Sequence, residues 1–452
     1  MSGDRDVDLI VLGAGMAGVT AANKAAQQGW RVAIVDRLPY GGTCALRGCD
    51  PKKILRRGAE IVDAARLLRG RGIDEAGLGI NWADLMRHKE GFTGPMPQGI
   101  EDRLVHNGVL TLHGPARFTG PGYVDIDGDE YHGSHALVAT GSRPRPLDFP
   151  GHEHLVDSTV FLDLEVLPSR IVFVGGGYIS FEFAHIAARA GSVPIIIDRQ
   201  ERPLKGFDPD LVDRLVARGD EAGVQVLAAT AVTAVERSGT GWRVGVERSG
   251  RREWIEADLV VHGAGRVPDL EPLELAAAGV ESSPHGVTVH PHLQSITNPA
   301  VYAAGDAAAT EGMPLTPVAV AEGKVAASNM VKAAAQVPDY TGIPTVVFTI
   351  PELARVGLLE DQARQLGVDV DVRFTDTSAW YSNYRVGEHT AAVKILIDRA
   401  HDRIVGAHLL GPEYAELVNI IGLAMKLGLT TRQVKSMTAA YPTVGSDLGS
   451  LL

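Results

Sequence analysis

Two glycine-rich segments of the same form constrain the fold of this chain more than any other feature. The first spans residues 13–18 (GAGMAG) and follows an apolar run at 7–12. An alanine-rich stretch and a second apolar run at 32–35, ending in Asp36, come after it. In such a βαβ unit the glycines make a tight turn and let a pyrophosphate approach the helix N-terminus, while the acid accepts from a ribose hydroxyl. The segment predicts a dinucleotide site that includes Gly13, Gly15, Gly18 and Asp36.

The second copy spans residues 175–180 (GGGYIS), between an apolar run at 171–174 and another at 195–197 that ends in Asp198. In both copies the first glycine and the acid are 23 positions apart. Ser180 replaces the third glycine, so a small side chain must fit between helix and strand. The copy predicts a second nucleotide site with Gly175, Gly177, Tyr178, Ile179 and Asp198. Two such sites imply two nucleotides and an electron path between them.

Length and composition fit this interpretation. A chain of 452 residues exceeds one ordinary core and predicts two to four domains. An apolar content of 45% with 52 glycines is typical of α/β proteins. The net charge of −12 argues against nucleic acid and anionic lipid as partners. With no long apolar run and no export signal at residues 1–8, we expect no membrane association and a cytoplasmic enzyme.

The chain has only two cysteines, Cys44 and Cys49. In an ideal helix this spacing separates the Cα atoms by roughly 8 to 9 Å, more than the 4.4 to 6.8 Å of a disulfide, so a bridge requires a distorted turn. Gly48 provides backbone freedom beside Cys49, and the cation of Arg47 favours a thiolate. A redox role is therefore favoured. A structural disulfide and a zinc site fit poorly, and two inert buried thiols remain an alternative.

The stretch Gly-Gly-Thr-Cys-x4-Cys-x-Pro-Lys at residues 41–52 resembles the redox segment of the glutathione reductase, dihydrolipoamide dehydrogenase and mercuric reductase family of flavoprotein disulfide oxidoreductases. The resemblance covers essentially the whole chain. It implies that Cys44 is the interchange thiol that attacks the substrate and that Cys49 is the charge-transfer thiol against the flavin.

The resemblance also implies three domains. Residues 1–145 and 271–338 form a discontinuous FAD domain, because the segments at 137–144 and 260–268 mark crossovers out of and back into it. Residues 146–270 bind NAD(P)H. Residues 339–452 form an α+β dimerisation domain, with strands near 345–349, 370–375, 391–398 and 404–410 and helices at 360–365 and 413–427.

Further site residues follow from the same resemblance. Lys52 and Glu182 are expected to form an ion pair beside the flavin, and Tyr178 to cover the flavin until the nicotinamide displaces it. The remaining expected cofactor contacts are Gly42, Thr43, Ala116, Thr140, Gly141, Asp306, Thr316, Gly265 and Arg266.

The choice of nicotinamide nucleotide depends on residues after the second strand. Asp198 favours a 2′-hydroxyl and hence NADH, whereas Arg199, Arg202 and Lys205 favour a 2′-phosphate. The segment resembles that of NADPH-using glutathione reductases, with Arg199 and Lys205 at the phosphate-binding positions. NADPH is therefore expected, with NADH as the alternative.

The C-terminus departs from the family. Disulfide reductases end in His-Pro-x4-Glu, and that histidine moves protons to the interchange thiol, but here Tyr441 and Ser446 occupy the two positions. A phenol with a pKa near 10 is a poor base at neutral pH, although it can donate a hydrogen bond. Either the acceptor brings its own proton chemistry, or Asp447 or a nearby histidine acts instead.

These observations predict a homodimeric α/β oxidoreductase without a resident metal. It passes electrons from NADPH through FAD to Cys44–Cys49 and on to a small disulfide or another thiol-reactive small molecule. The alternative is an NAD(P)H:quinone or metal-ion oxidoreductase in which the flavin reduces the acceptor directly. A redox sensor without catalysis is disfavoured by the second nucleotide segment.

Overall fold

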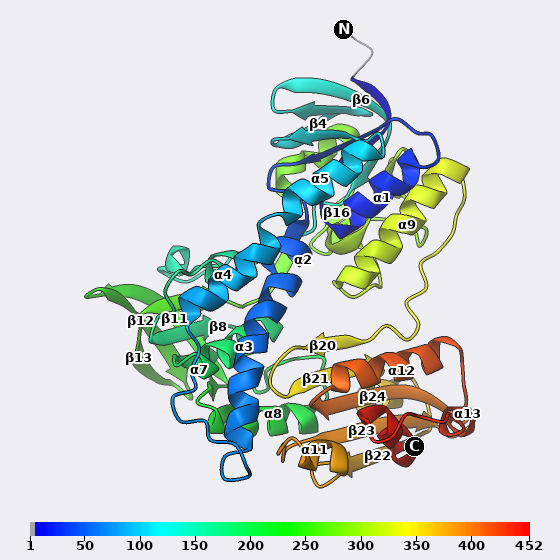
Figure 1. Cartoon of the computed structure of the whole chain (residues 1–452). Coiled ribbons are helices and arrows are strands. Elements are labelled where there is room, and N and C mark those ends of the chain that lie inside the picture. Colours follow the sequence, from blue (N-terminus) through cyan, green and yellow to red (C-terminus); the bar gives the residue numbers. More distant parts are fainter. Residues whose placement is uncertain (1–4) are drawn as a thin grey trace. The chain divides into compact units, whose positions relative to one another are not determined.

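The computed structural model describes residues 5–452, and the chain forms two compact units (Figure 1). The first unit comprises Met1–Lys52, His88–Arg145 and Arg266–Tyr340. The second comprises Lys53–Arg87, Pro146–Gly265 and Thr341–Leu452. The finer division into three domains remains a prediction.

The first unit is built on a mostly parallel sheet, as the glycine segment predicted. Its strand order is β3-β2-β1-β6-β5-β4, and β18 pairs with β6. The strands are β1 (Asp6–Leu12), β2 (Val32–Asp36), β3 (Leu110–His113), β4 (Ala116–Gly120), β5 (Tyr123–Ile126), β6 (Asp129–Val138) and β18 (Val301–Ala303). β4–β5 and β5–β6 are antiparallel and the other pairs are parallel. Because β1, β2 and the end of β6 are almost continuously apolar, both faces of this part of the sheet are buried.

Two helices lie side by side against this sheet, α1 (Met16–Ala26) and α9 (Thr316–Lys332) (Figure 1). Their contact is close because both are rich in alanine and glycine, and a Cβ at Gly323 would lie 2.4 Å from the carbonyl oxygen of Ala17. This contact fixes the start of α9 relative to the glycine turn before α1. The unit also contains α2 (Gly42–Arg47), α5 (Met96–His106) and a small sheet of β16 (Ser282–Ser283), β17 (Gly286–Thr288) and β19 (Ala308–Ala309).

The two crossover segments pair with each other. β7 (Ser142–Pro144) is antiparallel to β15 (Arg266–Pro268). The chain therefore leaves and re-enters the first unit along one short ribbon, which explains why residues far apart in sequence share its site.

The second unit contains a parallel four-stranded sheet of order β10-β9-β8-β14. Its strands are β8 (Arg170–Val174), β9 (Val193–Ile197), β10 (Gln225–Leu227) and β14 (Leu259–His262), with helices α7 (Tyr178–Arg189) and α8 (Pro209–Glu221). This confirms the second βαβ unit. The antiparallel sheet of β11 (Thr230–Ser238), β12 (Gly241–Arg248) and β13 (Arg251–Ala257) was not predicted from the sequence.

The C-terminal part of the second unit is α+β, as expected. Its five-stranded sheet has the order β20-β21-β24-β23-β22. The strands are β20 (Thr345–Val347), β21 (Glu352–Gly357), β22 (Val370–Asp376), β23 (Ala392–Asp398) and β24 (Arg403–Gly411), with α10 (Glu360–Gln365) and α12 (Tyr414–Lys426). β21 was missed because its sequence, ELARVG, lacks a continuous apolar run.

The remaining helices are shorter or link these layers. They are α3 (Cys49–Leu67), which continues from the first unit into the second, α4 (Trp82–Thr93), α6 (Ser158–Leu162), α11 (Tyr381–Tyr384), α13 (Thr431–Lys435) and α14 (Leu448–Leu451). Single 3₁₀ turns occur at His152–His154, Glu271–Leu273, Leu275–Ala278, Gly305–Ala307 and Val444–Asp447.

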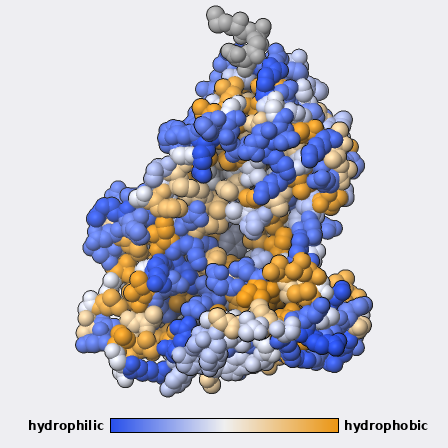
Figure 2. All heavy atoms as spheres, turned by 45° about the vertical axis from the view of Figure 1, so that its right-hand side comes forward, coloured by the Kyte–Doolittle hydropathy of each residue, from blue (hydrophilic) through white to orange (hydrophobic). Residues whose placement is uncertain are grey.

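The surface is mixed in character. On the face shown in Figure 2, hydrophilic side chains predominate and hydrophobic ones lie among them. Within residues 5–452, no helix combines the length and apolar character needed to cross a membrane.

Candidate functional site

The two cysteines lie on either side of a break between helices. α2 ends at Arg47, Gly48 separates the helices, and α3 begins at Cys49. A Cβ at Gly48 would lie 3.0 Å from the carbonyl oxygen of Thr43, so a larger residue would require this carbonyl to shift by a few tenths of an ångström. The distorted turn expected from the cysteine spacing is therefore present.

The two thiols and a hydroxyl form one cluster. Sγ of Cys49 lies 3.7 Å from Oγ1 of Thr316, the first residue of α9. The N-terminal ends of α3 and α9 direct their partial positive charges toward this cluster, which stabilises negative charge on sulfur. Both cysteines are reduced, and Cys49 is exposed while Cys44 is half-buried.

Cys44 holds a proton in this arrangement. Its hydrogen bond with Cys49 and its burial raise the pKa of the Cys44 thiol far above the usual range. At Cys44 these effects outweigh the lowering that the sequence led us to expect from Arg47. The raised pKa favours the protonated form of the Cys44 thiol.

The glycine turn of the first unit touches the redox segment. Gly42 has φ +63°, and a Cβ there would lie 2.7 Å from Cα of Gly15. Only glycine allows this approach, which places α2 directly beside the turn before α1. Asp36 completes the turn by accepting from the backbone N–H of Ala14 and of Leu38, each at 2.8 Å.

The residues of this turn fit a dinucleotide. A Cβ at Gly13 would overlap the carbonyl oxygen of Ala139 at 2.4 Å, which brings Thr140 and Gly141 to the same edge of the sheet. Oγ1 of Thr140 is fully buried and has no hydrogen-bond partner within residues 5–452. A buried orphan hydroxyl beside a glycine turn and a helix N-terminus is suited to a bound phosphate or ribose.

Asp306 is held from two sides. Oγ of Ser142 donates to Oδ2 of Asp306 at 2.8 Å, and Nε of Arg266 donates to Oγ of Ser142 at 3.0 Å. Arg266, expected to contact a cofactor, here contacts Ser142. Ser142 itself was not predicted from the sequence, although its position directly after Gly141 at the crossover was a usable signal.

Glu322 of α9 fixes the turn that carries Asp306. Its buried carboxylate accepts from the backbone N–H of Gly305 (2.6 Å), the hydroxyl of Thr310 (2.8 Å) and the hydroxyl of Tyr340 (2.6 Å). Burial raises the pKa of Glu322. This residue was also missed; a carboxylate inside an alanine-rich apolar helix was the signal.

The second glycine turn is equally crowded. A Cβ at Gly175 would lie 2.5 Å from Cα of Ala264, and one at Gly263 would lie 1.9 Å from Oγ of Ser180. The side chain at the third position of the segment is therefore accommodated by a glycine on the neighbouring loop, beside Gly265. Tyr178 begins α7 and is 46% exposed, whereas Ile179 packs on the core of this unit.

Asp198 faces this turn, because a Cβ at Gly176 would lie 2.2 Å from Oδ2 of Asp198. Burial raises the pKa of the Asp198 carboxyl. This reduces the repulsion that a carboxylate would exert on a phosphate bound nearby.

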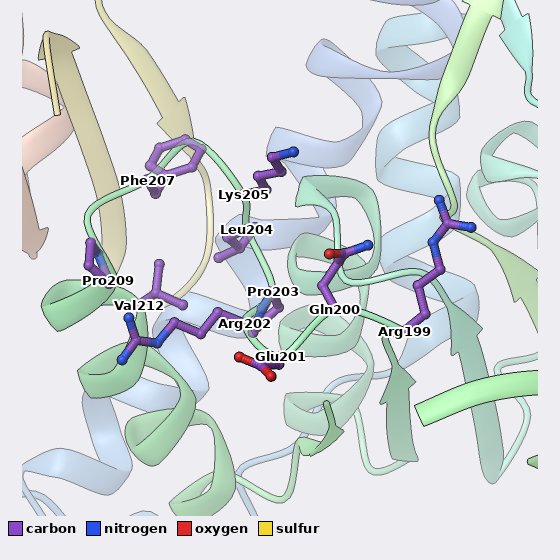
Figure 3. A pocket seen from close by; sticks show the side chains of 10 residues that line it. All are labelled: Arg199, Gln200, Glu201, Arg202, Pro203, Leu204, Lys205, Phe207, Pro209 and Val212. Carbon is purple, nitrogen blue, oxygen red and sulfur yellow. The ribbon is translucent and has the colours of Figure 1, made fainter. Parts of the chain in front are cut away.

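A surface pocket of about 890 Å³ follows Asp198 along the chain and is lined by Arg199, Arg202 and Lys205, among others. The side chain of Arg202 runs along Pro209 and Val212, away from Arg199 (Figure 3). A guanidinium nitrogen of Arg202 lies 3.8 Å from a carboxylate oxygen of Asp213. Arg199 and Lys205 thus remain the candidates for an anionic ligand.

The expected partners Lys52 and Glu182 belong to different units, and their ion pair remains a prediction. Both are buried, with exposures of 8% and 2%. Glu182 accepts from the backbone N–H of Phe348 at 2.8 Å. Ala116, at the start of β4, pairs with Ile126.

The C-terminal motif is exposed. Tyr441 is 83% exposed. Thr443 caps a 3₁₀ turn, and Ser446 completes the capping box through reciprocal hydrogen bonds with Thr443. Asp447 accepts from Oγ of Ser382 at 2.6 Å.

Comparison with known proteins decides the family. Residues 7–323 match the family described as "Pyridine nucleotide-disulphide oxidoreductase", and residues 343–451 match its dimerisation domain. The chain belongs to this family. Members bind FAD and use NAD(P)H as electron donor, so this protein is an FAD-dependent oxidoreductase, and the matching dimerisation domain indicates a homodimer.

Several relatives match along nearly the whole chain. A glutathione reductase from Burkholderia cepacia is 31% identical over 99% of this chain and 98% of its own length. A dihydrolipoyl dehydrogenase from Bacillus subtilis (strain 168) is 31% identical over 98% of this chain and 97% of its own. The structure of a cysteine-to-serine mutant of RclA from Escherichia coli, an HOCl-induced flavoprotein disulfide reductase solved as a Cu(II) complex, has a TM-score of 0.88 and 25% identity over 99% of each chain.

Proposed function

We propose that this enzyme passes two electrons from NADPH through FAD to the Cys44–Cys49 pair and on to a small thiol-reactive acceptor. The observation that carries the proposal is the thiol cluster of Cys44, Cys49 and Thr316 beside the glycine turn of the first unit. When bound, FAD supplies hydride acceptance from the nicotinamide and reduction of the disulfide. The fit of this turn to a dinucleotide supports FAD binding there, with Gly13, Thr140 and Asp306 among its contacts.

The dithiol can then reduce a disulfide in two balanced exchanges. Loss of the Cys44 proton lets its sulfur attack one sulfur of the acceptor, forming a mixed disulfide and releasing the first thiol. Sγ of Cys49 then attacks Sγ of Cys44, which re-forms the Cys44–Cys49 disulfide and releases the second thiol. Because the pKa of Cys44 is raised, the first exchange needs a base or a high pH.

Selection of NADPH is proposed for Arg199 and Lys205. Their cations line one pocket at the end of β9, and Asp198 is turned toward Gly176. Two cations within reach of a dianion outweigh one carboxyl group, and burial raises the pKa of that carboxyl. Ion pairing at this exposed site weakens with salt, so the preference for NADPH over NADH is expected to fall as ionic strength rises.

The acceptor is expected to be a compound that does not depend on a histidine base. Tyr441 stands where the family's proton-shuttling histidine would be, and we propose that it only donates a hydrogen bond to the acceptor.

A second candidate is direct reduction of a quinone or a metal ion by the flavin. It is favoured by the replacement of that histidine and by the RclA structure, which is described as a Cu(II) complex. In either case we propose a reducing compartment such as the cytoplasm, where a cysteine pair is more often catalytic than structural.

The Cys44→Ser variant separates the two candidates. If electrons leave through the thiols, reduction of a disulfide such as 5,5′-dithiobis(2-nitrobenzoate) falls by at least about 10³-fold. Flavin reduction by NADPH, followed by stopped flow, stays near the wild-type rate and serves as the control for folding. Retained turnover with the disulfide contradicts the thiol route, and retained turnover with a quinone alone identifies a separate flavin reaction.

A further inference from the structure

A row of basic side chains crosses the C-terminal sheet of the second unit. In the strand register, Arg355 of β21 is opposite His408 of β24, and His408 is opposite Lys394 of β23. Residues opposite each other on neighbouring strands project to the same face. The three side chains therefore form a line across three strands, defined here as the basic row.

One end of the basic row binds the start of α8. The amine of Lys394 lies 2.7 Å from Oδ2 of Asp208, 2.5 Å from Oδ2 of Asp210 and 3.8 Å from Oε2 of Glu360. The side chains of Lys394 and Asp208 are 4% and 1% exposed. Oδ1 of Asp208 caps α8 by accepting from the backbone N–H groups of Asp210 and Leu211.

The other end of the row binds the segment just before α8. Arg355 donates a hydrogen bond to the carbonyl oxygen of Gly206, and its guanidinium carbon lies 5.6 Å from the ring centre of Phe207. The row thus holds the three residues that directly follow Lys205. On the N-terminal side of Lys205, the backbone N–H of Leu204 donates to the carbonyl oxygen of Gly176 in the second glycine turn.

His408 separates the two cations without adding charge. It is fully buried, and its Nε2 lies 3.0 Å from the carbonyl oxygen of Leu358, an acceptor that requires a proton on this nitrogen. Burial lowers the pKa of His408 to about 4, so the ring is neutral at physiological pH.

We propose that the basic row is a positioning element for nucleotide recognition: Lys394 and Arg355, from the C-terminal sheet, fix residues 206–208 and thereby set where Lys205 meets the 2′-phosphate of NADPH. The inference rests on the proposed NADPH specificity. Neither residue touches the nucleotide in this assignment, so each acts through the loop.

The burial of the Lys394–Asp208 pair supports a role in geometry. Desolvation largely cancels the attraction within a buried ion pair, so such a pair adds little net stability compared with a packed apolar pair. What it provides is a defined position, because the amine must satisfy carboxylates on one short segment. That segment lies between the pocket cations and α8.

The test compares wild type, Lys394→Met, Lys394→Arg and the matched control Arg373→Met. Arg373 lies on β22 of the same sheet and pairs with Asp371 at 2.9 Å. For each protein two quantities are measured: KM and kcat with NADPH and with NADH, and hydrogen exchange of the amides of residues 204–208. Because Lys394→Met leaves Asp208 buried and unpaired, the double variant D208N/K394M is included, in which Asn retains the α8 cap.

We expect Lys394→Met to speed exchange in residues 204–208 and to raise KM for NADPH by about tenfold, with kcat and KM for NADH nearly unchanged. Lys394→Arg should restore most of the NADPH affinity, and Arg373→Met should behave as wild type. If Lys394→Met leaves the hydrogen exchange of residues 204–208 unchanged, the inference is overturned. It is also overturned if exchange becomes faster but the ratio of KM for NADPH to KM for NADH stays the same. If wild type shows no preference for NADPH, the proposed nucleotide specificity fails, whereas the exchange data still report separately whether the row orders the loop.

Discussion

Cys44 keeps its proton because Cys49 lies within hydrogen-bonding distance and the surrounding protein removes water. In this family's chemistry a base must take that proton before Cys44 can attack a disulfide. Tyr441 replaces the family's proton-shuttling histidine in the sequence, and a phenol is in general a poor base at neutral pH. The rate of disulfide reduction is therefore expected to rise with pH as the thiolate fraction of Cys44 grows.

Replacing Tyr441 by histidine should supply the missing base. We expect Tyr441→His to raise kcat/KM for a disulfide acceptor at pH 7 by about 10- to 100-fold, since general base catalysis typically contributes about 10² to 10⁴ and Ser446 does not orient the ring as a glutamate would. The pH–rate profile of the variant should reach a plateau above about pH 6.5. Tyr441→Phe is the control, and an equal effect of both substitutions would show that position 441 handles no proton.

The two pocket cations, Lys205 and Arg199, can be tested by single substitutions. Lys205→Met and Arg199→Met should each lower kcat/KM for NADPH by about tenfold and leave that for NADH within about twofold, because only the 2′-phosphate is affected. Arg202→Met is the matched control, since Arg202 is turned toward Asp213. A comparable loss for NADH in the first two variants would place both residues at a site shared by the two nucleotides.

At the scale of elements, α9 connects the thiols to the Asp306 turn. Its first residue, Thr316, contacts Cys49, and Glu322, further along the helix, holds Gly305. We expect Glu322→Ala to lower the free energy of unfolding by about 1 to 3 kcal/mol, because three partly buried donors lose their acceptor. The same variant should release FAD faster on dilution, as measured by free flavin fluorescence.

Glu322→Gln gives a pH test of the same contact. Because burial raises the folded-state pKa of Glu322, its stabilising contribution is fully present below the unfolded pKa of about 4.3 and is lost as pH rises through the folded value. The glutamine variant should therefore gain stability relative to wild type as the pH rises above about 4.3 and through the folded-state pKa of Glu322, as measured by denaturant titrations. A constant difference across this range would show that Glu322 does not titrate in the folded protein.

Much of the element order could be predicted from the sequence, because glycine turns and buried parallel strands leave local signatures. Both βαβ units, the break at Gly48 and α10 are examples. Ser142 and Glu322 left signals in the sequence, but the partners of Ser142 and Lys394, Asp306 and Asp208, could not be predicted, since each contact joins segments far apart in the chain. The sheet of β11 to β13 was missed although its alternating pattern, as in Val244 and Val246 facing the core, was available.

At the scale of the molecule, the same dinucleotide unit occurs once in each compact unit. This repetition explains why the chain needs two nucleotides and why only one of the two turns lies beside cysteines: Gly42 of the redox segment approaches Gly15 of the first turn. The family match adds the dimerisation domain at residues 343–451. For the whole enzyme, we propose that electrons pass from the nicotinamide nucleotide through the flavin to the thiols.

Anaerobic titration of the purified protein with NADPH, followed by the visible flavin spectrum, is the first test of this electron path. We predict a long-wavelength charge-transfer band after two electrons, because Cys49 is the proposed charge-transfer thiol, and we predict that NADPH produces no such band in Cys49→Ser. Bleaching of the flavin without the band in the wild-type protein would contradict the thiol route and leave direct transfer from flavin to the acceptor.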